Sequence, residues 1–180
     1  MKTITKLDNY RKWKKQLKPE QYLQGGDLVK LNRYWTQLRV GSCELRVETM
    51  RFGRDSRERK DRQCVLCAEG GVEDEEHLLF DCTTYTQIRN EMMNEIETKT
   101  MGQKQMNDEK VSRETKMRWM MGGEHEEVRK ATRKFVQKAI ILRMQLMNEI
   151  EKKQNQENAK KRKEAKERKE RAKQKRKRKD

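Results

Sequence analysis

Three of the four cysteines and one of the two histidines fall within residues 64–82, and this cluster constrains the fold more than any other feature. The pattern is Cys-x2-Cys-x9-His-x4-Cys, with a Gly-Gly pair between its two halves. Thiols two residues apart can hold one ion from a tight turn, and the glycines let the chain reverse. Three thiolates and one imidazole complete a tetrahedral shell that suits Zn²⁺. We therefore expect one structural zinc, with Cys64, Cys67, His77 and Cys82 as its ligands.

The fourth cysteine and the second histidine lie outside this cluster. Cys43 is interpreted as a buried free thiol, and the alternative is that it replaces one of the ligands. His125 follows two glycines at an expected helix start and is interpreted as solvated. The alternative to a metal site is that the clustered residues are ordinary core or surface side chains. A reducing compartment favours the metal, because thiols there rarely pair as disulfides.

The composition limits the size of the core. Only 32% of the 180 residues are hydrophobic, below the roughly 45–50% of an ordinary globular domain. A single proline and few β-branched runs argue against a β-sandwich, and the thin core argues against a large enzyme built on a sheet. We therefore expect bound metal to supply part of the folding free energy.

Apolar residues recur at helical spacing along most of the chain, so the expected fold is mainly α. The principal helices are expected at 27–40, 83–97 and 124–150, packed around the cysteine cluster. The expected organisation is a basic N-terminal segment (1–26), a helical metal-binding module (27–97), a linker with a short helix (98–123), a long amphipathic helix (124–150) and a Lys/Arg-rich tail (151–180). The tail is expected to be a solvated helix or disordered.

The formal net charge of +16 is concentrated near the C-terminus. Residues 151–180 contain 16 Lys and Arg against 6 Asp and Glu, a net charge of +10. Dense basic runs bind phosphates through counterion release, and they also serve as nuclear localisation signals. The tail has no aromatic residue for base stacking, so sequence-specific readout is not expected there. The alternative is a charged tail without a partner. The expected phosphate-binding residues of the tail are Lys160, Lys161, Arg162, Lys163, Lys175, Arg176, Lys177, Arg178 and Lys179.

A second basic segment directly precedes the cysteine cluster. It carries a net charge of +2 over residues 53–63 and could reach phosphates. An acidic run at 73–76 lies on the other side of Cys67 and would repel them. The candidate contacts of this basic loop are Arg54, Arg57, Arg59, Lys60 and Arg62.

The order of motifs in residues 34–89 is more specific than a generic zinc knuckle. A helix ending in Leu38-Arg39-Val40-Gly41 precedes Cys-x-x-Cys, the acidic run and His-x-Leu-x-x-Cys, and Tyr85 and Arg89 follow. This succession resembles the C-terminal zinc-binding module of non-LTR retrotransposon reverse transcriptases. The resemblance implies an all-helical module around one zinc that contacts nucleic acid. It departs from that family at Thr83, where a proline is usual, and no palm domain with paired aspartates is present to support polymerase activity.

We therefore expect a non-catalytic, zinc-binding protein that contacts the phosphate backbone of RNA or DNA. The alternative is a zinc-stapled protein-interaction or coiled-coil module, in which the 124–150 helix binds a partner or a second copy. A metalloenzyme is disfavoured because four protein ligands leave no open position for water. No membrane span is expected, since no apolar run approaches 18 residues. No small-molecule substrate is expected either. The N-terminus lacks an apolar leader, so the expected location is the nucleus or cytoplasm.

Overall fold

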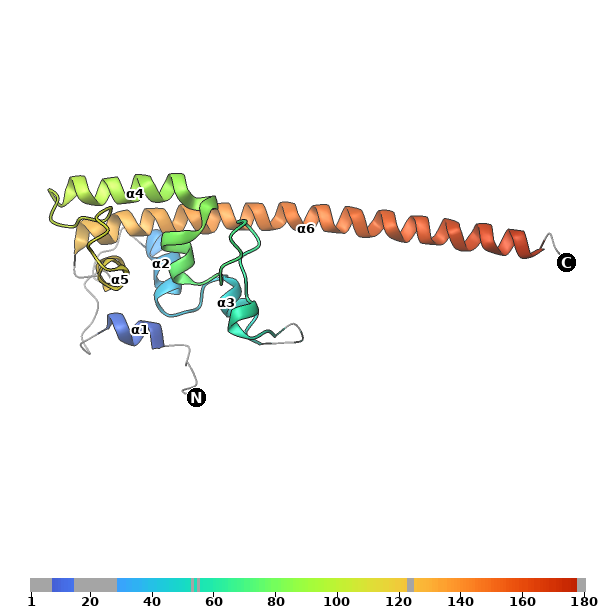
Figure 1. Cartoon of the computed structure of the whole chain (residues 1–180), viewed down its shortest axis with the longest axis horizontal. Coiled ribbons are helices and arrows are strands. Elements are labelled where there is room, and N and C mark those ends of the chain that lie inside the picture. Colours follow the sequence, from blue (N-terminus) through green and yellow to red (C-terminus); the bar gives the residue numbers. More distant parts are fainter. Residues whose placement is uncertain (1–7, 15–28, 53, 55, 123–124, 178–180) are drawn as a thin grey trace. The chain divides into compact units, whose positions relative to one another are not determined.

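The computed structural model describes residues 8–14, 29–52, 54, 56–122 and 125–177, and it confirms a mainly helical fold. Within these ranges there are six α-helices and no strand (Figure 1). The helices are α1 (Asp8–Trp13), α2 (Val29–Arg39), α3 (Arg46–Thr49), α4 (Thr86–Lys99), α5 (Arg113–Gly122) and α6 (Glu126–Lys177). Three short helical turns are η3 (Arg59–Asp61), η4 (His77–Asp81) and η5 (Thr83–Tyr85).

The chain divides into two compact units, Met1–Ile141 and Leu142–Asp180. The division falls within α6, which contributes to both. All four candidate metal ligands belong to the first unit. The metal site is therefore built within one unit.

The core of the first unit is centred on Trp35 of α2, which is completely buried. Its indole N–H donates a hydrogen bond of 3.2 Å to the carbonyl oxygen of Met120 on α5. The guanidinium groups of Arg39 and Arg133 lie 4.6 and 5.0 Å from the indole ring, at cation–π distance. Methionine, a flexible side chain that fills irregular gaps, supplies much of the remaining core. The buried methionines are Met92, Met93, Met106, Met117, Met120 and Met121.

α4 runs antiparallel to the first part of α6 (Figure 1). Lys138 pairs with Glu91 at 3.0 Å, and Lys134 pairs with Glu95 at 2.7 Å, so residue numbers rise along one helix as they fall along the other. Ion pairs this exposed contribute little to stability. The buried side chains on α4 and on the first turns of α6 therefore provide most of the stabilisation.

The apolar stripe expected on the 124–150 helix is buried where α6 belongs to the first unit. Val128, Ala131, Phe135 and Ala139 are all buried. Within the second unit, every side chain described from 151 to 171 is exposed. Residues of high helix propensity and pairs such as Glu157–Lys161, at 2.6 Å, support the helix there. Within the described ranges, no helix combines the length and apolarity that crossing a bilayer requires.

Candidate metal centre

The structure brings the four predicted ligands together, and they could hold one metal ion. Their donor atoms all lie within 4.8 Å of one another. The two sulfur atoms of Cys64 and Cys82 are 3.9 Å apart, and Sγ of Cys67 is 3.3 Å from Nε2 of His77. A tetrahedral zinc with bonds of about 2.3 Å to sulfur and about 2.0 Å to nitrogen has edges of roughly 3.8 Å between sulfurs and roughly 3.5 Å between sulfur and nitrogen. The residues present therefore fit a zinc-sized ion.

A short reversal of the chain positions the first two ligands. The N–H of Cys64 donates to the carbonyl of Gly71 at 2.8 Å, and an isolated antiparallel bridge joins Gln63 to Val72. Gly70 has φ of +64°, a conformation that favours glycine. The N–H of Leu66 points back to Sγ of Cys64 at 3.4 Å, which helps to orient that sulfur. The glycine pair thus closes the turn as the sequence predicts.

The other two ligands lie at the two ends of a π-helical turn, η4. The N–H of Cys82 donates to the carbonyl of His77, five residues earlier, at 2.8 Å. In an α-helix, residues five apart point about 140° away from each other, because each residue advances about 100°. The wider π turn brings them back toward one face. The His-x4-Cys spacing, which does not match an α-helical face, is the sequence signal for this turn.

Asp74 fixes the start of that turn. Its Oδ1 accepts a hydrogen bond of 3.0 Å from the N–H of His77, which is the role of an N-cap. Its Oδ2 accepts a 2.7 Å bond from the guanidinium of Arg59. Asp74 therefore joins the basic loop to the ligand-bearing turn.

Arg89 of α4 fixes the end of the turn. Its buried guanidinium donates to the carbonyl oxygen of Cys82 at 2.7 Å and to that of Leu78 at 3.3 Å. The carbonyl of Cys82 also accepts the N–H of Tyr85 at 3.2 Å, so Arg89 joins this carbonyl to that of Leu78. Burial lowers the pKa of Arg89. The reverse transcriptase resemblance included Arg89 without a role, and the structure shows that it positions the turn carrying His77 and Cys82.

The thiols differ in their affinity for protons. The hydrogen bond between Cys64 and Cys82, followed by burial, raises the pKa of Cys64, and the same bond lowers the pKa of Cys82. The pKa of Cys67 is raised, mainly by desolvation. The Cys64 thiol therefore keeps its proton at neutral pH. A metal ion must displace this proton, because thiolates are the ligands.

Cys43 and His125 lie outside the group. Cys43 is buried, and its pKa is raised to about 12, chiefly by burial and then by the charge of Glu75. It stays protonated at neutral pH. His125 precedes α6, away from the four ligands. In the part of the chain that the structure describes, one group of metal-binding side chains converges, and it contains neither residue.

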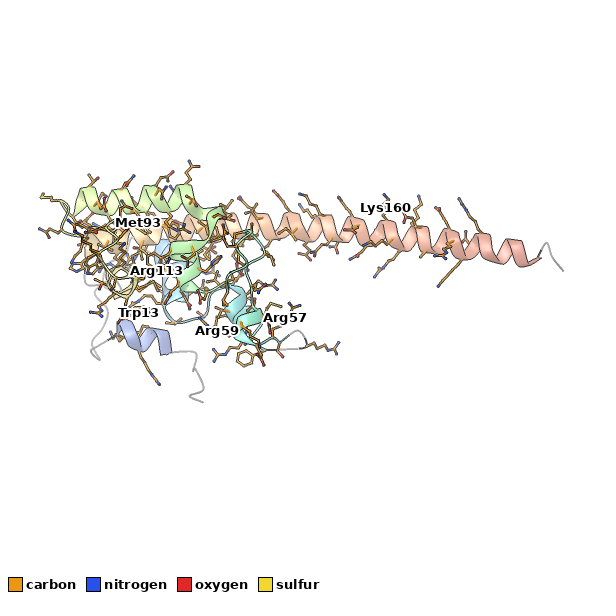
Figure 2. All side chains as sticks on the ribbon, viewed as in Figure 1. Trp13, Arg57, Arg59, Met93, Arg113 and Lys160 are labelled. Atoms are coloured by element: carbon orange, nitrogen blue, oxygen red, sulfur yellow. The ribbon has the colours of Figure 1, made fainter. Side chains whose placement is uncertain are left out.

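The basic loop divides into structural and exposed arginines. Arg62 donates to the carbonyls of Val47 and Arg57, at 2.7 and 2.8 Å, so its guanidinium holds the loop together. Arg59 is paired with Asp74, and Lys60 is paired with Glu58 at 3.0 Å. Arg54 and Arg57 are exposed and form no ion pair with a described residue. Figure 2 shows Arg57 and Arg59 beside α3.

The acidic run at 73–76 is partly buried. Glu73 and Glu75 are buried, and Oε2 of Glu73 accepts a 3.0 Å hydrogen bond from the N–H of Arg46 at the start of α3. The carboxylate of Asp74 accepts hydrogen bonds from the guanidinium of Arg59 and the N–H of His77. Glu76 is the exposed member. The run therefore presents less negative charge to the surface than its composition suggests, because Glu73 and Glu75 are buried and the carboxylates of Glu73 and Asp74 accept backbone N–H groups.

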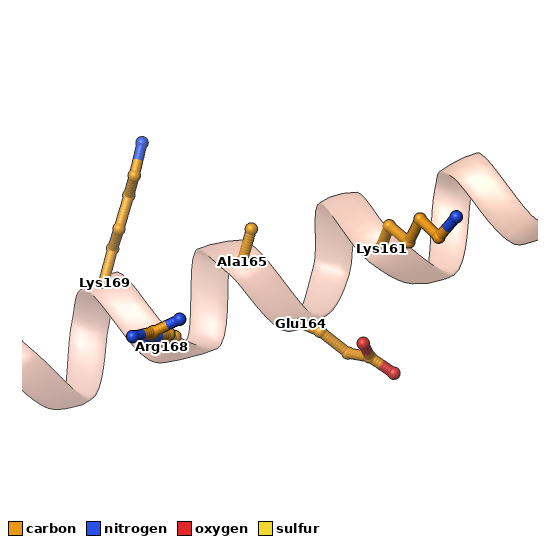
Figure 3. Close-up of a pocket in the computed structure, with 5 residues that line it drawn as sticks. All are labelled: Lys161, Glu164, Ala165, Arg168 and Lys169. Atoms are coloured by element: carbon orange, nitrogen blue, oxygen red, sulfur yellow. The ribbon is translucent and has the colours of Figure 1, made fainter.

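The tail residues up to Lys177 belong to α6, and the side chains described from 151 to 171 are exposed. Lys160, Lys161, Arg162 and Lys163 are exposed on α6. Lys175, Arg176 and Lys177 belong to its last turn, and Arg178 and Lys179 lie outside the described residues. A shallow strip nearby is lined by Lys161, Glu164, Ala165, Arg168 and Lys169 (Figure 3). All five come from a single helix, so the strip has no opposing wall.

Comparisons of the chain with protein-family models, with curated proteins and with solved structures find no match. The resemblance to the reverse transcriptase zinc module therefore rests on the motifs of residues 34–89. The chemistry of the site rests on its own geometry.

Proposed function

We propose that the four ligands hold one structural Zn²⁺ and that the protein binds nucleic acid through its phosphate backbone, without sequence specificity. The convergence of three sulfurs and one imidazole nitrogen within 4.8 Å supports the zinc assignment, and the Cys64–Cys82 and Cys67–His77 distances are close to tetrahedral edge lengths. Sulfur-rich sets of this kind favour zinc over hard cations such as Mg²⁺. Four protein ligands fill the shell, so the ion stabilises the fold and does not activate water.

The contacts around the site support a folding role. Glu73 links it to α3, and Arg89 links it to α4. Asp81 accepts two hydrogen bonds from the guanidinium of Arg113 at the start of α5, at 2.6 and 3.1 Å. Elements far apart in the sequence thus meet at the ligand-bearing turn. Metal binding at this junction would stabilise all of these contacts together.

Charge and exposure support nucleic acid as the partner. The tail concentrates a net charge of +10 in 30 residues, and its described side chains are exposed. In the first unit, Arg54 and Arg57 add exposed positive charge, and two of the four carboxylates of the acidic run, Glu73 and Glu75, are buried. The reverse transcriptase resemblance implies the same class of partner. Binding of this kind weakens steeply as salt rises.

The coiled-coil alternative is weaker. The apolar stripe of α6 contributes Val128, Ala131, Phe135 and Ala139 to the core of the first unit. Leu142, Leu146 and Ile150 remain half-buried in the second unit, and alanines are the only apolar residues after them. A stable coiled coil needs three or four heptads of apolar seam. The remaining stripe is too short for that.

One experiment separates these functions. Zinc content of the purified full chain is measured by elemental analysis, and binding of labelled RNA and DNA is followed by fluorescence anisotropy across a salt series. We expect one zinc per chain and a linear fall of log affinity with log salt. Changing the four residues at 160–163 to glutamine should make the salt dependence on a duplex shallower, by about 0.9 in slope for each phosphate that is no longer neutralised.

A matched variant raises the charge of the same helix. Changing Glu164, Glu167 and Glu170 to glutamine should strengthen binding, because carboxylates that repel phosphate are removed. Self-association without nucleic-acid affinity at low salt would favour the interaction module. Absence of zinc from the purified chain would contradict the proposal that the four ligands hold a structural Zn²⁺.

A further inference from the structure

Phe52 is the one exposed aromatic side chain among the described residues. It is 75% exposed, whereas the other described aromatic side chains are buried or half-buried. Phe52 follows α3 and stands at the start of the basic loop. A lone exposed apolar residue is ordinary on a protein surface, so its surroundings decide whether the ring has a use.

The base of the loop is held firmly. The N–H of Arg57 donates to the carbonyl of Met50 at 3.0 Å, which closes the segment that contains Phe52. The guanidinium of Arg62 then binds the carbonyls of Val47 and Arg57 from inside. Arg62 directly precedes the chain reversal that carries Cys64 and Cys67, and its carbonyl accepts the N–H of Glu73 at 2.9 Å. The ring is therefore presented on a segment anchored to the metal-binding turn.

One arginine lies beside the ring and two more follow it in the sequence; the first, Arg51, also pairs with Glu48 at 3.6 Å. The guanidinium of Arg51 lies 5.4 Å from the centre of the Phe52 ring. Arg54 and Arg57 follow on the same segment, exposed and without an ion pair to any described residue. An exposed aromatic ring interleaved with arginines is the arrangement on which unpaired bases stack while cations hold the neighbouring phosphates. Paired bases are already stacked within a duplex and cannot offer their faces to such a ring.

We propose that Phe52 is a stacking platform for an unpaired base, and that Arg54 and Arg57 bind the adjoining phosphates. The ligand is thus single-stranded RNA or DNA. This inference rests on the proposed nucleic-acid function and deepens it by naming the form of nucleic acid and the residue that selects it. The tail has no aromatic residue, so it supplies affinity for either form and the loop supplies the preference.

The test uses the full, zinc-loaded chain with fluorescein-labelled U12 RNA, dT12 DNA and a 12-base-pair duplex. Phe52→Ala should weaken binding of both single strands by on the order of tenfold, and leave duplex binding and the salt slope unchanged. Phe52→Tyr should retain the affinity, because tyrosine also stacks. Arg54→Ala should reduce the single-strand salt slope by about 0.7.

Met101→Ala is the matched control, because Met101 is apolar, 91% exposed and outside the basic loop. It should change none of these affinities. Zinc content and circular dichroism check that each variant folds. Both substitutions should be tolerated, because the side chains of Phe52 and Met101 are exposed.

The outcomes separate the two proposals. If the parent chain binds single strands and Phe52→Ala binds them equally well, the stacking platform is overturned and the proposed function stands. If Phe52→Ala weakens duplex and single strands alike, the preference for unpaired bases is overturned. If the parent chain binds neither form at low salt, the proposed function fails and the platform fails with it.

Discussion

Gly71 lies against the imidazole of His77 so closely that a β-carbon at residue 71 would stand 3.0 Å from Nδ1 and 3.4 Å from Cε1. The imidazole ring is planar and rigid, and Nε2 on its other side is 3.3 Å from Sγ of Cys67. A β-carbon at residue 71 would therefore require the imidazole ring to shift by a few tenths of an ångström, which would disturb its distance to the ligand sulfurs. The position of the His77 ring in the candidate metal centre therefore depends on a glycine at residue 71.

We expect Gly71→Ala to weaken zinc binding by about 10- to 100-fold, the range seen when groups that orient ligands are changed. Competition with a colorimetric chelator measures the affinity. Gly70→Ala is the matched control: its φ of +64° makes alanine strained, but a β-carbon there meets nothing within 4 Å. It should lower stability and leave zinc affinity intact once the protein is folded. Equal zinc affinity for Gly71→Ala and the parent chain would contradict the steric argument.

Removal of a ligand should abolish stoichiometric zinc binding. We expect Cys64→Ser and His77→Ala each to lose the metal and much of the helical circular dichroism, because the ion supplies folding free energy to a thin core. Cys43→Ser should keep one zinc per chain, since Cys43 is outside the ligand group. Elemental analysis after gel filtration gives the stoichiometry. Release of zinc by Cys43→Ser would refute the ligand assignment.

Removing Arg89 should destabilise the chain without removing a ligand. Arg89→Ala removes the guanidinium donor from the carbonyls of Leu78 and Cys82, and the loss of such charge-assisted bonds costs about 2 kcal/mol. Urea unfolding of the zinc-loaded chain measures this change. The control is Arg118→Ala, because Arg118 is exposed and pairs with Glu114 in an i,i+4 arrangement. Arg118→Ala should barely change the midpoint of urea unfolding. Comparable effects of the two substitutions would exclude a special role for Arg89.

Zinc affinity should rise with pH. The raised pKa of Cys64 means that its thiol is protonated at neutral pH, so binding expels a proton, whereas the lowered pKa of Cys82 means that it loses its proton more readily. Each expelled proton changes the apparent affinity by about tenfold per pH unit. Calorimetry in buffers of different ionisation enthalpy counts the protons released. An affinity that does not change between about pH 6.5 and 7.5 would show that the thiols are already ionised.

The ligand set and the helices were predictable because both depend on local pattern. The Cys-x2-Cys-x9-His-x4-Cys spacing identifies four donors whatever the rest of the fold does, and the structure brings them together. The stripe through Val128 and Phe135 repeats with the period of a helix, and it is buried. The helix at 83–97 likewise corresponds to η5 and α4, Thr83–Tyr85 and Thr86–Lys99.

Other features depend on which segments meet. From composition alone, Arg39, Arg62 and Arg133 would be expected to be surface cations. In the fold, Arg39 and Arg133 pack against Trp35. Arg62 instead donates a hydrogen bond to a backbone carbonyl. The acidic run likewise faces partly inward, because Glu73 reaches the start of α3.

The sequence by itself therefore determined the donor atoms, the helical periodicity and the distribution of charge, since each is a property of neighbouring residues. Only the tertiary structure decided which charged side chains are buried, why residue 71 has no space for a side chain, and where the exposed ring of Phe52 stands. Hydrogen-bond partners and burial arise from contacts between distant segments, and no local pattern encodes them.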